Sequence, residues 1–454
     1  MFKKIQRVHF VGIGGIGMSG IAEVLLNRGY RVSGSDLKLS AVTQRLASLG
    51  AQISQGHTAE NVGAADVVVI SAAIRPDNPE IVEAQQRKTP IIPRAEMLAE
   101  LMRMKYGITV AGTHGKTTTT SMVATVLQQA RMDPTVVVGG RLNLLDSNAK
   151  LGAGEFMVVE ADESDRSFLL LSPTIAVVTN IEEDHMESYA GLEDLKNAFV
   201  QFVNRVPFYG SAILCLDEPN VQSIIPEIKR RILSYGFSSQ ADLNVHGFEQ
   251  QGFETRFQLR FNGTLLDPVR LRVPGRHNVL NAAAAAAVGL DLGISSAEIK
   301  TALESFGGAD RRFQVKGEGR GITVVDDYAH HPTEIKATLE AARGLGEHRL
   351  VVIFQPHRYS RTQYCFEEFA RAFYQADVLL VTDIYPAGEE PLPGVNSEKL
   401  VEAVQRHGHK NVRYVPAWEA VPGLLESELR SGDLVITMGA GNIWRVSEEL
   451  AQQL

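Results

Sequence analysis

Residues 108–120 read ITVAGTHGKTTTT, an apolar β-branched run followed by a glycine-rich loop and a threonine-rich segment. This order is typical of a buried strand that ends in a phosphate-binding loop and continues as a helix. Backbone N–H groups of such a loop can surround phosphate oxygens, Lys116 can reach the outer phosphates, and the Thr117 hydroxyl can bind Mg²⁺. Val110 stands where the standard loop has its outer glycine, so this loop is a shorter variant. We predict a triphosphate site formed by Gly112, Thr113, His114, Gly115, Lys116, Thr117 and Thr118.

A second glycine-rich loop, GIGGIGM, follows the apolar run at residues 8–11. Its glycines let the backbone approach a pyrophosphate, whose charge is favoured at the N-terminus of the following helix. Asp36 ends the next expected strand, where a carboxylate can accept a hydrogen bond from a ribose hydroxyl. Binding of NAD is one interpretation of this loop, and a tight strand–helix turn without a ligand is another.

The two loops together narrow the function more than either loop alone. A dehydrogenase needs a dinucleotide loop and has no use for a triphosphate loop, whereas a simple ATPase needs only the triphosphate loop. A chain with both loops is therefore expected to bind a nucleotide-linked substrate and a separate nucleoside triphosphate.

Apolar β-branched runs alternate with helical patterns along most of the chain, which predicts an α/β fold with parallel sheets. Short alternating segments separated by glycine and proline over residues 242–273 predict a small antiparallel sheet. We predict three domains: a Rossmann-like domain at 1–105, a central P-loop-type α/β domain with the antiparallel sheet at 106–309, and a Rossmann-like domain at 310–454. Helices are expected over residues 95–105, 117–132 and 281–292.

Titratable side chains follow two expected strands of the central segment. Glu160 and His185 come at the strand ends, where α/β proteins bind their ligands. Glu160 is placed to bind the Mg²⁺ of a triphosphate, and His185 is a candidate metal ligand or proton carrier. A solvated acidic loop and an ordinary surface histidine are the alternatives.

Two further clusters lie in the C-terminal segment. Residues 326–332 read DDYAHHP and are dense in groups whose pKa depends on their surroundings, although a cap for a helix beginning near Thr333 is the simpler interpretation. Arg358 and Arg361 are three residues apart and expected on one helical turn, where they could hold a carboxylate through paired hydrogen bonds. Ordinary surface arginines are the alternative.

The composition is that of an ordinary globular protein, with 454 residues, 44% hydrophobic, 22% charged and a net charge of −8. Proteins that bind nucleic acid mainly through phosphates usually carry excess positive charge, so no nucleic acid partner is expected. No apolar run is long enough to cross a bilayer and the N-terminus lacks the features of a cleavable signal, so we predict a cytoplasmic protein without membrane insertion. Cys215 and Cys365 are expected to be buried thiols.

The motifs and their order along the chain resemble those of the bacterial muramyl ligases of peptidoglycan synthesis. The resemblance covers essentially the whole length and rests on GIGGIGM, GTHGKTTTT, EADESD, TNIEEDHM, GRHNVLNA, DRRF, DDYAHHP and GAGNI. Within the family, the chain is most similar to the branch that adds the first amino acid, L-alanine, to UDP-N-acetylmuramate. The resemblance implies an ATP-dependent ligase that uses Mg²⁺. Both a monomer and a homodimer remain open.

The resemblance also implies roles for matching positions. The UDP diphosphate would be held by Gly14, Gly15, Ile16, Gly17 and Met18, and the uridine would lie near Asp36 and the Ser71-Ala72-Ala73 loop. ATP would be held by the 112–118 loop, with His277, Asn278 and Asn281 at the adenine and Asp327 at the ribose. Mg²⁺ would be bound in two sites by Thr117, Glu160 and His185. The incoming alanine would be held by Tyr328, His330, Arg358 and Arg361, and Arg312 would meet phosphate.

The reaction that the resemblance implies proceeds through an acyl-phosphate. The lactyl carboxylate of the substrate attacks the γ-phosphate of ATP while Lys116, Mg²⁺ and Arg312 neutralise charge, and the amine of alanine then displaces phosphate. Either His185 or His330 takes the proton. Several later-acting relatives carry a carbamylated lysine about 14 residues after the histidine that matches His185, and Phe199 occupies that position here, so no such lysine is expected.

Three alternatives remain. A related recycling ligase attaches a ready-made tripeptide to the same UDP-sugar and shares the first loop and a histidine-rich motif. The Arg358 and Arg361 pair favours a small free amino acid over that tripeptide. A nicotinamide-dependent oxidoreductase would leave the triphosphate loop unused, and a non-catalytic nucleotide-sensing regulator would leave the arginine pair and the histidine cluster unexplained.

Overall fold

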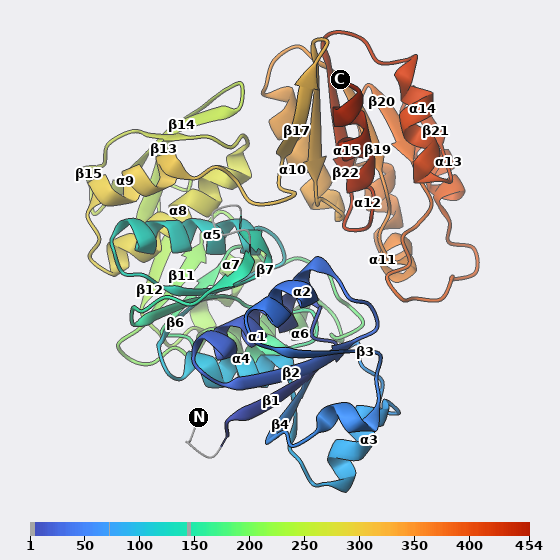
Figure 1. The fold of residues 1–454 in the computed structure, drawn as a ribbon. Coiled ribbons are helices and arrows are strands. Elements are labelled where there is room, and N and C mark those ends of the chain that lie inside the picture. Colours follow the sequence, from blue (N-terminus) through green and yellow to red (C-terminus); the bar gives the residue numbers. More distant parts are fainter. Residues whose placement is uncertain (1–4, 72, 143–146) are drawn as a thin grey trace. The chain divides into compact units, whose positions relative to one another are not determined.

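The computed structural model describes residues 5–71, 73–142 and 147–454 (Figure 1). The chain divides into two compact units. Unit 1 comprises Met1–Asn244, Arg260–Thr264 and Asn281–Leu303, and unit 2 comprises Val245–Leu259, Leu265–Leu280 and Glu304–Leu454. Parallel strands alternate with helices in both units, which confirms the predicted α/β class.

The first sheet of unit 1 is parallel and has the strand order β3-β2-β1-β4-β5. Its strands are β1 (Arg7–Val11), β2 (Arg31–Asp36), β3 (Gln52–Gln55), β4 (Val67–Ile70) and β5 (Ile91–Pro93). Its helices are α1 (Ile16–Asn27), α2 (Ala41–Ser48), η1 (Ala59–Val62), α3 (Pro79–Gln86) and α4 (Arg94–Met102). Apolar residues of α1, α2 and α4 pack on one face and those of α3 and η1 on the other (Figure 1). The strand order reverses at β1, so the GIGGIGM loop lies at the position where such sheets bind ligands.

The second sheet of unit 1 is built around β6 (Tyr106–Ala111), which ends at the GTHGK loop. Its order is β12-β11-β10-β6-β9-β7-β8, parallel except for the pair of β7 and β8. The other strands are β7 (Thr135–Leu142), β8 (Ser147–Lys150), β9 (Phe156–Glu160), β10 (Ile175–Val178), β11 (Ser211–Cys215) and β12 (Ile232–Gly236). The helices are α5 (Lys116–Gln129), η2 (Ser167–Leu170), α6 (Leu192–Val203), α7 (Pro219–Ile224) and η3 (Ile225–Glu227).

The segment predicted as a small antiparallel sheet holds β13 (Leu243–Gln251), β14 (Glu254–Phe261), β15 (Thr264–Leu265) and β16 (Val269–Leu271). Strands β14 and β16 pair antiparallel, as predicted. They do not form a separate small sheet, however, because β13 pairs parallel with β12 and β13–β16 continue the second sheet into one mixed sheet of 11 strands. Helices α8 (Arg276–Asp291) and α9 (Ser296–Ser305) follow.

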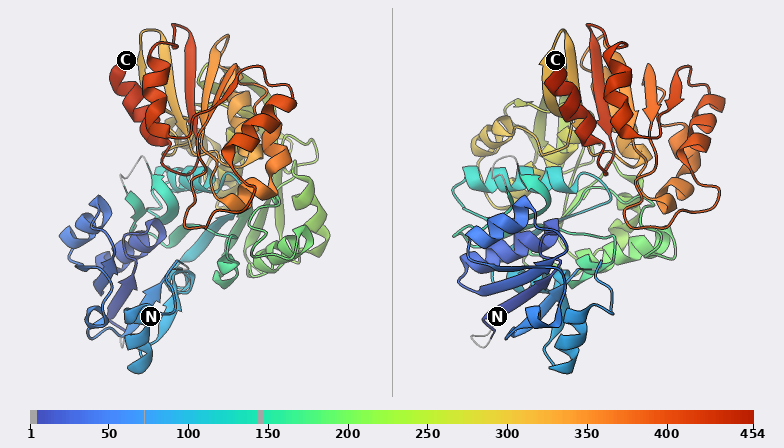
Figure 2. Two further views of the ribbon diagram at one scale, coloured as in Figure 1. Left: turned by 90° about the vertical axis from the view of Figure 1, so that its right-hand side faces the viewer. Right: turned by 45° about the vertical axis from the view of Figure 1, so that its right-hand side comes forward.

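The sheet of unit 2 has the order β17-β18-β22-β19-β20-β21, in which only β17 is antiparallel to its neighbour. The strands are β17 (Gln314–Gly319), β18 (Ile322–Asp327), β19 (Arg349–Phe354), β20 (Val378–Val381), β21 (Val412–Tyr414) and β22 (Asp433–Met438). The helices are α10 (Pro332–Arg343), α11 (Tyr359–Tyr364), α12 (Phe366–Ala370), α13 (Ser397–Arg406), η4 (Trp418–Ala420), α14 (Val421–Glu426) and α15 (Trp444–Gln453). Two apolar cores lie on opposite faces of this sheet, one with α10, α12 and α13 and one with α14 and α15 (Figure 2).

Three expected helices have different bounds in the structure. The helix expected over 95–105 ends at Met102, after which the chain forms tighter turns: Met104 N donates to Leu101 O and Lys105 N donates to Met102 O. The helix expected over 117–132 ends at Gln129, since Arg131 and Asp133 have positive φ angles of 57° and 38°. The helix expected to begin at 281 begins instead at Arg276, directly after Gly275. Among the residues that the structure describes, none of the helices combines the length and apolar character needed to cross a membrane.

Candidate active site

The loop between β6 and α5 requires glycine at two positions. Gly112 and Gly115 have φ angles of +138° and +79°, which side-chain-bearing residues rarely adopt. A Cβ atom would lie 2.0 Å from Thr179 Oγ1 at Gly112 and 2.6 Å from Asn281 Oδ1 at Gly115. Gly115 is also the N-cap of α5, whose first N–H groups and dipole favour an anion. The loop therefore has the backbone form of a phosphate site.

Lys116 is the first residue of α5 and lies over this loop. Its Nζ donates to Gly112 O at 2.6 Å, to Thr113 O at 3.1 Å and to Glu163 Oε1 at 2.7 Å. Burial alone would lower the pKa of Lys116, but Glu163 and the neighbouring carboxylates outweigh it and raise that pKa. The ammonium group is therefore charged at neutral pH and lies beside the backbone that a phosphate would contact.

Glu163 is a partner of Lys116 that the sequence reasoning missed. Its side chain is 2% exposed, and the Tyr189 hydroxyl donates to its backbone carbonyl at 2.5 Å. Burial raises the pKa of Glu163, while Lys116 opposes that shift. In the sequence, Glu163 is one of several acidic residues of EADESD, and the motif does not reveal which of their carboxylates is buried.

Thr117 and Glu160 lie side by side, as their positions predicted. Glu160 ends β9, which is parallel to β6, and its Oε2 accepts a hydrogen bond from Thr117 Oγ1 at 2.9 Å. A hydroxyl and a carboxylate at this distance are hard oxygen donors of the kind that Mg²⁺ prefers. The pair therefore fits a magnesium ion beside the phosphate loop.

His185 occupies the loop after β10 with a positive φ of 58°. Its Nε2 lies 3.6 Å from Asp184 Oδ2 and its Nδ1 lies 3.6 Å from Glu187 Oε1. His185 is also one of the groups that lower the pKa of Glu163, although burial has the larger, opposite effect. His185 therefore lies in the same acidic cluster. Phe199, the position at which some relatives carry the modified lysine, is fully buried and packs against Phe168 at a ring distance of 5.2 Å.

The loop after β10 also supports the phosphate loop. Asn180 Oδ1 accepts from His114 N at 2.7 Å, and Thr179 Oγ1 donates to His114 O at 2.6 Å. Thr113 Oγ1 accepts from the backbone N–H of Glu182 at 2.9 Å. Thr118 is buried, so its contribution to a ligand would come from the backbone.

Asp36, at the end of β2, is hydrogen-bonded to the GIGGIGM loop. Its Oδ2 accepts from Gly14 N at 2.9 Å, and a Cβ at Gly14 would lie 2.8 Å from the same oxygen. A Cβ at Gly17 would meet Arg94 Nη1 at 2.9 Å. Met18 is buried in the core, so it can reach a diphosphate only through its backbone, whereas Gly15 is exposed.

Two further features surround this loop. Gly12, the first residue of this loop, has a φ of +79°, and a Cβ there would lie 3.9 Å from Ser71 Oγ, so the Ser71 loop is adjacent to it. Ala73 is exposed, and Ala72 lies outside the described residues. Arg94 Nη2 also donates to Asp162 Oδ2 at 3.5 Å, which joins the first loop to EADESD. Arg94 was missed because nothing local distinguishes it from a surface arginine.

In unit 2, Asp327 at the end of β18 is buried and holds the local backbone. Its Oδ2 accepts from Phe313 N at 2.7 Å and its Oδ1 from Ala329 N at 2.7 Å. Burial raises its pKa to about 6, against the opposing effect of Arg312. The following segment ends in the predicted helix cap, because the His331 side chain accepts from Thr333 N at the start of α10.

Tyr328 and His330 lie beside arginines and a carboxylate. The guanidinium carbons of Arg311 and Arg312 each lie 5.0 Å from the Tyr328 ring centroid. His330 Nδ1 lies 3.0 Å from Tyr328 O and 3.3 Å from Glu334 Oε2. Glu334 also meets Arg312 Nη1 at 3.5 Å, so one carboxylate joins the histidine to the arginine.

His357 and Tyr385 complete this cluster, and neither was identified from the sequence. Their rings stack at 5.5 Å with an interplanar angle of 8°, and His357 meets the His330 ring at 5.9 Å. Arg361 is buried, with Nη1 3.4 Å from His357 Nδ1. Arg358 is the N-cap of α11 with a φ of +71°, so the expectation that both arginines lie on one helical turn is wrong in part.

The residues expected at adenine lie along α8. His277 belongs to unit 2, and burial followed by the charge of Arg312 lowers its pKa to about 4, so its ring is neutral at pH 7. Asn278 donates to Pro274 O at 2.7 Å. Asn281 belongs to unit 1, where its Oδ1 accepts from Thr119 Oγ1 at 3.1 Å beside Gly115.

Models of known families match along almost the whole chain. The "Mur ligase family, catalytic domain" matches residues 7–106, the "Mur ligase middle domain" residues 110–289 and the "Mur ligase, glutamate ligase domain" residues 311–441. The UDP-N-acetylmuramate–L-alanine ligase of Geotalea uraniireducens (strain Rf4) is 60% identical over 454 residues, covering 100% of this chain and 99% of the relative. The ligase of the same name from Geobacter sulfurreducens is 58% identical over 456 residues, with the same coverage.

Solved structures show the same relationship. A UDP-N-acetylmuramate-alanine ligase from Thermotoga maritima matches with a TM-score of 0.84 and 31% identity, covering 98% of both chains. A murein peptide ligase from Psychrobacter arcticus, at 24% identity, has a TM-score of 0.73 over 98% of both chains and so shares the fold. Three consecutive family models, full-length relatives and the two glycine loops lead to one conclusion: this chain belongs to the Mur ligase family.

Proposed function

We propose that the chain joins L-alanine to the carboxylate of UDP-N-acetylmuramate in peptidoglycan synthesis, with hydrolysis of ATP to ADP and phosphate. The observation that carries this proposal is the presence of two separate glycine loops in unit 1, at the ends of β1 and β6. One loop suits a nucleotide-linked substrate and the other an energy donor. The relatives at 58% and 60% identity carry the name of this activity over their full length.

In unit 1, the proposed roles follow the geometry of each loop. Gly14, Gly15, Ile16 and Gly17 would hold the UDP diphosphate with the backbone of Met18, and Asp36, Ser71 and Ala73 would lie near the uridine. The 112–118 loop would hold the ATP phosphates, with Asn281 beside it. Transfer of phosphate requires neutralisation of negative charge in the transition state, and Lys116 is charged and placed over that loop.

Mg²⁺ would be held by Thr117 and Glu160, with His185 as a candidate ligand of a second ion. The paired oxygens of Thr117 and Glu160 support the first assignment. A bound magnesium ion supplies positive charge that offsets the phosphate oxygens. Lys116 would also supply positive charge at the outer phosphate, through its ammonium group.

In unit 2, Tyr328, His330, Arg358 and Arg361 are proposed to hold alanine. His330 Nδ1 faces a carbonyl and a carboxylate, so it acts as the donor in the neutral ring, which leaves Nε2 as the basic nitrogen. Both ring nitrogens of His185 lie beside carboxylates instead. This difference favours His330 as the group that takes the proton from the amine.

Four further unit 2 residues would act on ATP. Arg312 would meet phosphate, His277 and Asn278 would face adenine, and Asp327 would lie near the ribose. Both oxygens of Asp327 already accept backbone N–H groups, so any contact with a ribose would use their remaining lone pairs. We also propose domain boundaries near residues 105 and 309 and a cytoplasmic location.

Phosphate release in the presence of ATP, Mg²⁺ and UDP-N-acetylmuramate tests the function. We expect release that depends on L-alanine in a panel with serine, glycine and the L-Ala-γ-D-Glu-meso-diaminopimelate tripeptide. Release that requires the tripeptide would identify the recycling activity instead. Lys116→Ala should abolish turnover while binding of UDP-N-acetylmuramate, measured by calorimetry, persists; wild-type turnover in this variant would reject the assignment of the triphosphate loop.

A further inference from the structure

Glu80 is a buried carboxylate in the first turn of α3, and it has no part in the proposed reaction. Its side chain is 0% exposed. Burial alone would raise the pKa of Glu80, but hydrogen bonds from His9, Asn61 and Ser35 outweigh it and lower that pKa, so the group is an anion at neutral pH. A buried charge is costly unless several donors surround it, so the identity of its donors indicates its role.

The donors to Glu80 come from three other elements around the first sheet. Ser35 in β2 donates from Oγ to Glu80 Oε2 at 2.7 Å, and Nε2 of His9 in β1 lies 3.3 Å from the same oxygen. Asn61 in η1 donates from Nδ2 to Oε1 at 2.7 Å. We call Glu80, His9, Ser35 and Asn61 the Glu80 hub. The hub joins β1, β2, η1 and α3 through one carboxylate.

Ser35 connects the Glu80 hub to the GIGGIGM loop. Its backbone carbonyl accepts from Gly12 N at 2.8 Å and from Ile13 N at 3.0 Å, so it holds the first two residues of that loop. Its side chain is fixed from two directions. The one O–H of Ser35 goes to Glu80, so Oγ accepts from His57 Nδ1, 2.9 Å away. The position of the start of the loop therefore depends on a residue that the hub holds.

Asn61 connects the Glu80 hub to Asp36 by a second route. Its Nδ2 also donates to Gly56 O at 3.1 Å, and Gly56 N donates to Asp36 O at 2.8 Å. Asp36 in turn accepts from Gly14 N through Oδ2. Both residues of β2 that hold the loop are thus bonded to the hub carboxylate, one directly and the other through Asn61 and Gly56.

We propose that Glu80 is a positioning residue for the UDP-linked substrate, which keeps Ser35 and Asp36 in place so that the GIGGIGM loop is ready to bind the diphosphate. This inference rests on the proposed binding of UDP-N-acetylmuramate at that loop. Backbone N–H groups that are ordered before binding lose less conformational freedom when the ligand arrives. The triphosphate loop is held by the segment after β10 instead, so loss of the hub should leave ATP binding unchanged.

Glu80→Gln tests this role with little change in side-chain volume. A glutamine has one acceptor oxygen and one NH2 group, so it cannot accept from Ser35 and Asn61 on separate oxygens. We expect KM for UDP-N-acetylmuramate in the phosphate-release assay to rise about tenfold or more, because hydrogen bonds to a charged group are lost. The values of kcat and of KM for ATP should stay unchanged. Partial unfolding would have the opposite signature, since it lowers kcat and leaves KM as it was.

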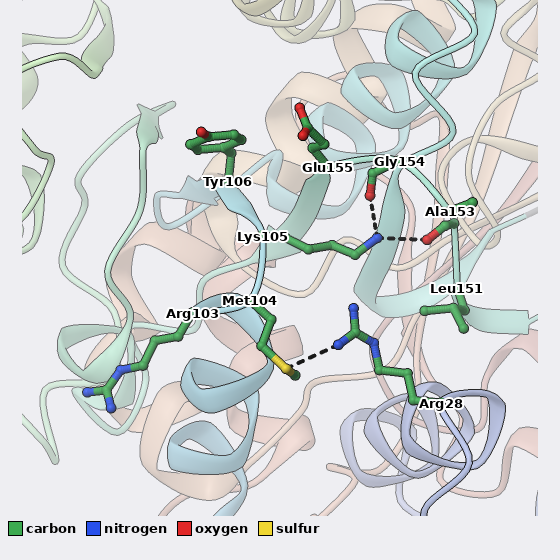
Figure 3. A pocket seen from close by; sticks show the side chains of 10 residues that line it. Arg28, Arg103, Met104, Lys105, Tyr106, Leu151, Ala153, Gly154 and Glu155 are labelled. Atoms are coloured by element: carbon green, nitrogen blue, oxygen red, sulfur yellow. Dashed lines mark hydrogen bonds between the residues drawn. The ribbon is translucent and has the colours of Figure 1, made fainter. Parts of the chain in front are cut away.

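Two variants of unit 1 are matched controls. Glu83→Gln makes the same change three residues later in α3 and removes a pair with Arg87. Lys105→Met removes the hydrogen bonds from Nζ to the carbonyl oxygens of Gly152 and Gly154, at the wall of a cavity of about 590 Å³ (Figure 3). This second control should lower the stability of unit 1 without touching the Glu80 hub. Both controls should keep the wild-type KM for UDP-N-acetylmuramate.

Hydrogen exchange of the Gly12, Ile13 and Gly14 amides gives a readout that needs no ligand. These amides should exchange faster in Glu80→Gln than in wild type or in either control. Unchanged exchange or an unchanged KM in Glu80→Gln would overturn the proposal. Faster exchange in a chain whose wild type does not bind UDP-N-acetylmuramate would support the positioning role and reject the proposed substrate.

Ser35→Ala tests the direct route from the hub to the loop, because it removes the hydroxyl and keeps the backbone carbonyl. This variant should also raise KM for UDP-N-acetylmuramate. Combined with Glu80→Gln, it should raise KM no further than Glu80→Gln alone, since both changes break the same connection. Additive effects of the two changes would show that the residues act separately and would contradict the proposal.

Discussion

Lys116 and Glu163 form an ion pair that is largely withdrawn from solvent, with side chains 16% and 2% exposed and an Nζ–Oε1 distance of 2.7 Å. Lys116→Met would keep the length of the side chain but leave the Glu163 carboxylate buried without its counter-ion. Removal of one partner of a buried pair costs about 3–5 kcal/mol of folding free energy. We therefore expect this variant to lose both activity and stability.

Glu163→Gln in the same chain separates these two losses. The neutral amide removes the buried charge, so the double variant should recover most of the stability that Lys116→Met loses. Activity should not return, because no ammonium group remains at the phosphate loop. The coupling between the two sites follows from comparing both single variants, the double variant and wild type.

The assay must report on unit 1. Both tryptophans, Trp418 and Trp444, lie in unit 2, so urea unfolding should be followed by circular dichroism and by hydrogen exchange of α5 amides. Lys196→Met is the matched control, because Lys196 pairs with Glu193, whose side chain is 82% exposed, and such pairs contribute about 0.2–1 kcal/mol. A Lys116→Met variant as stable as this control, or a double variant no more stable than Lys116→Met, would refute the reasoning.

Three other substitutions test separate parts of the site. Gly115→Ala would place an alanine at a φ of +79° with its Cβ 2.6 Å from Asn281 Oδ1. Calorimetry should therefore show that ATP binds at least tenfold more weakly while binding of the UDP substrate is unchanged. Equal weakening of both would indicate general damage. In the folded protein the pKa of Asp327 is raised to about 6, whereas in the unfolded chain it lies near 4. The contribution of this carboxyl group to stability is therefore fully present below pH 4 and is lost as pH rises through 6. The free energy of unfolding of unit 2, monitored by tryptophan fluorescence, should therefore fall by about 2 kcal/mol between pH 4 and 7 relative to Asp327→Asn, and parallel pH profiles would contradict this. Arg361→Lys should raise KM for alanine at least tenfold and change kcat little, since a lysine cannot hold a carboxylate through two parallel hydrogen bonds; an unchanged KM would remove Arg361 from the alanine site.

The features that could be predicted from the sequence are those encoded by local patterns. The strand Arg7–Val11, the strand Tyr106–Ala111 and the glycine loops after them follow from apolar runs and from glycines with positive φ. Thr117 and Glu160 could be expected to meet, because the ends of neighbouring parallel strands share one edge of a sheet.

The residues that were missed depend on packing between distant segments. Glu163 is the buried member of an acidic run, and only its contact with α5 distinguishes it. Arg94 reaches Asp162 across 68 positions of sequence, and His357 stacks on Tyr385 from a separate loop. Local periodicity carries no information about such pairings. The same limit applies to Lys105, whose Nζ donates to backbone carbonyls of a loop almost 50 residues away.

A crystal structure of the chain with UDP-N-acetylmuramate and a non-hydrolysable ATP analogue tests most directly whether two phosphate loops serve two ligands. We predict the uridine diphosphate against Gly14–Gly17 and the triphosphate against Gly112–Thr118, both at full occupancy. A single loop that accepts either ligand, or a GTHGK loop that stays empty at saturating analogue, would contradict the proposed division of roles.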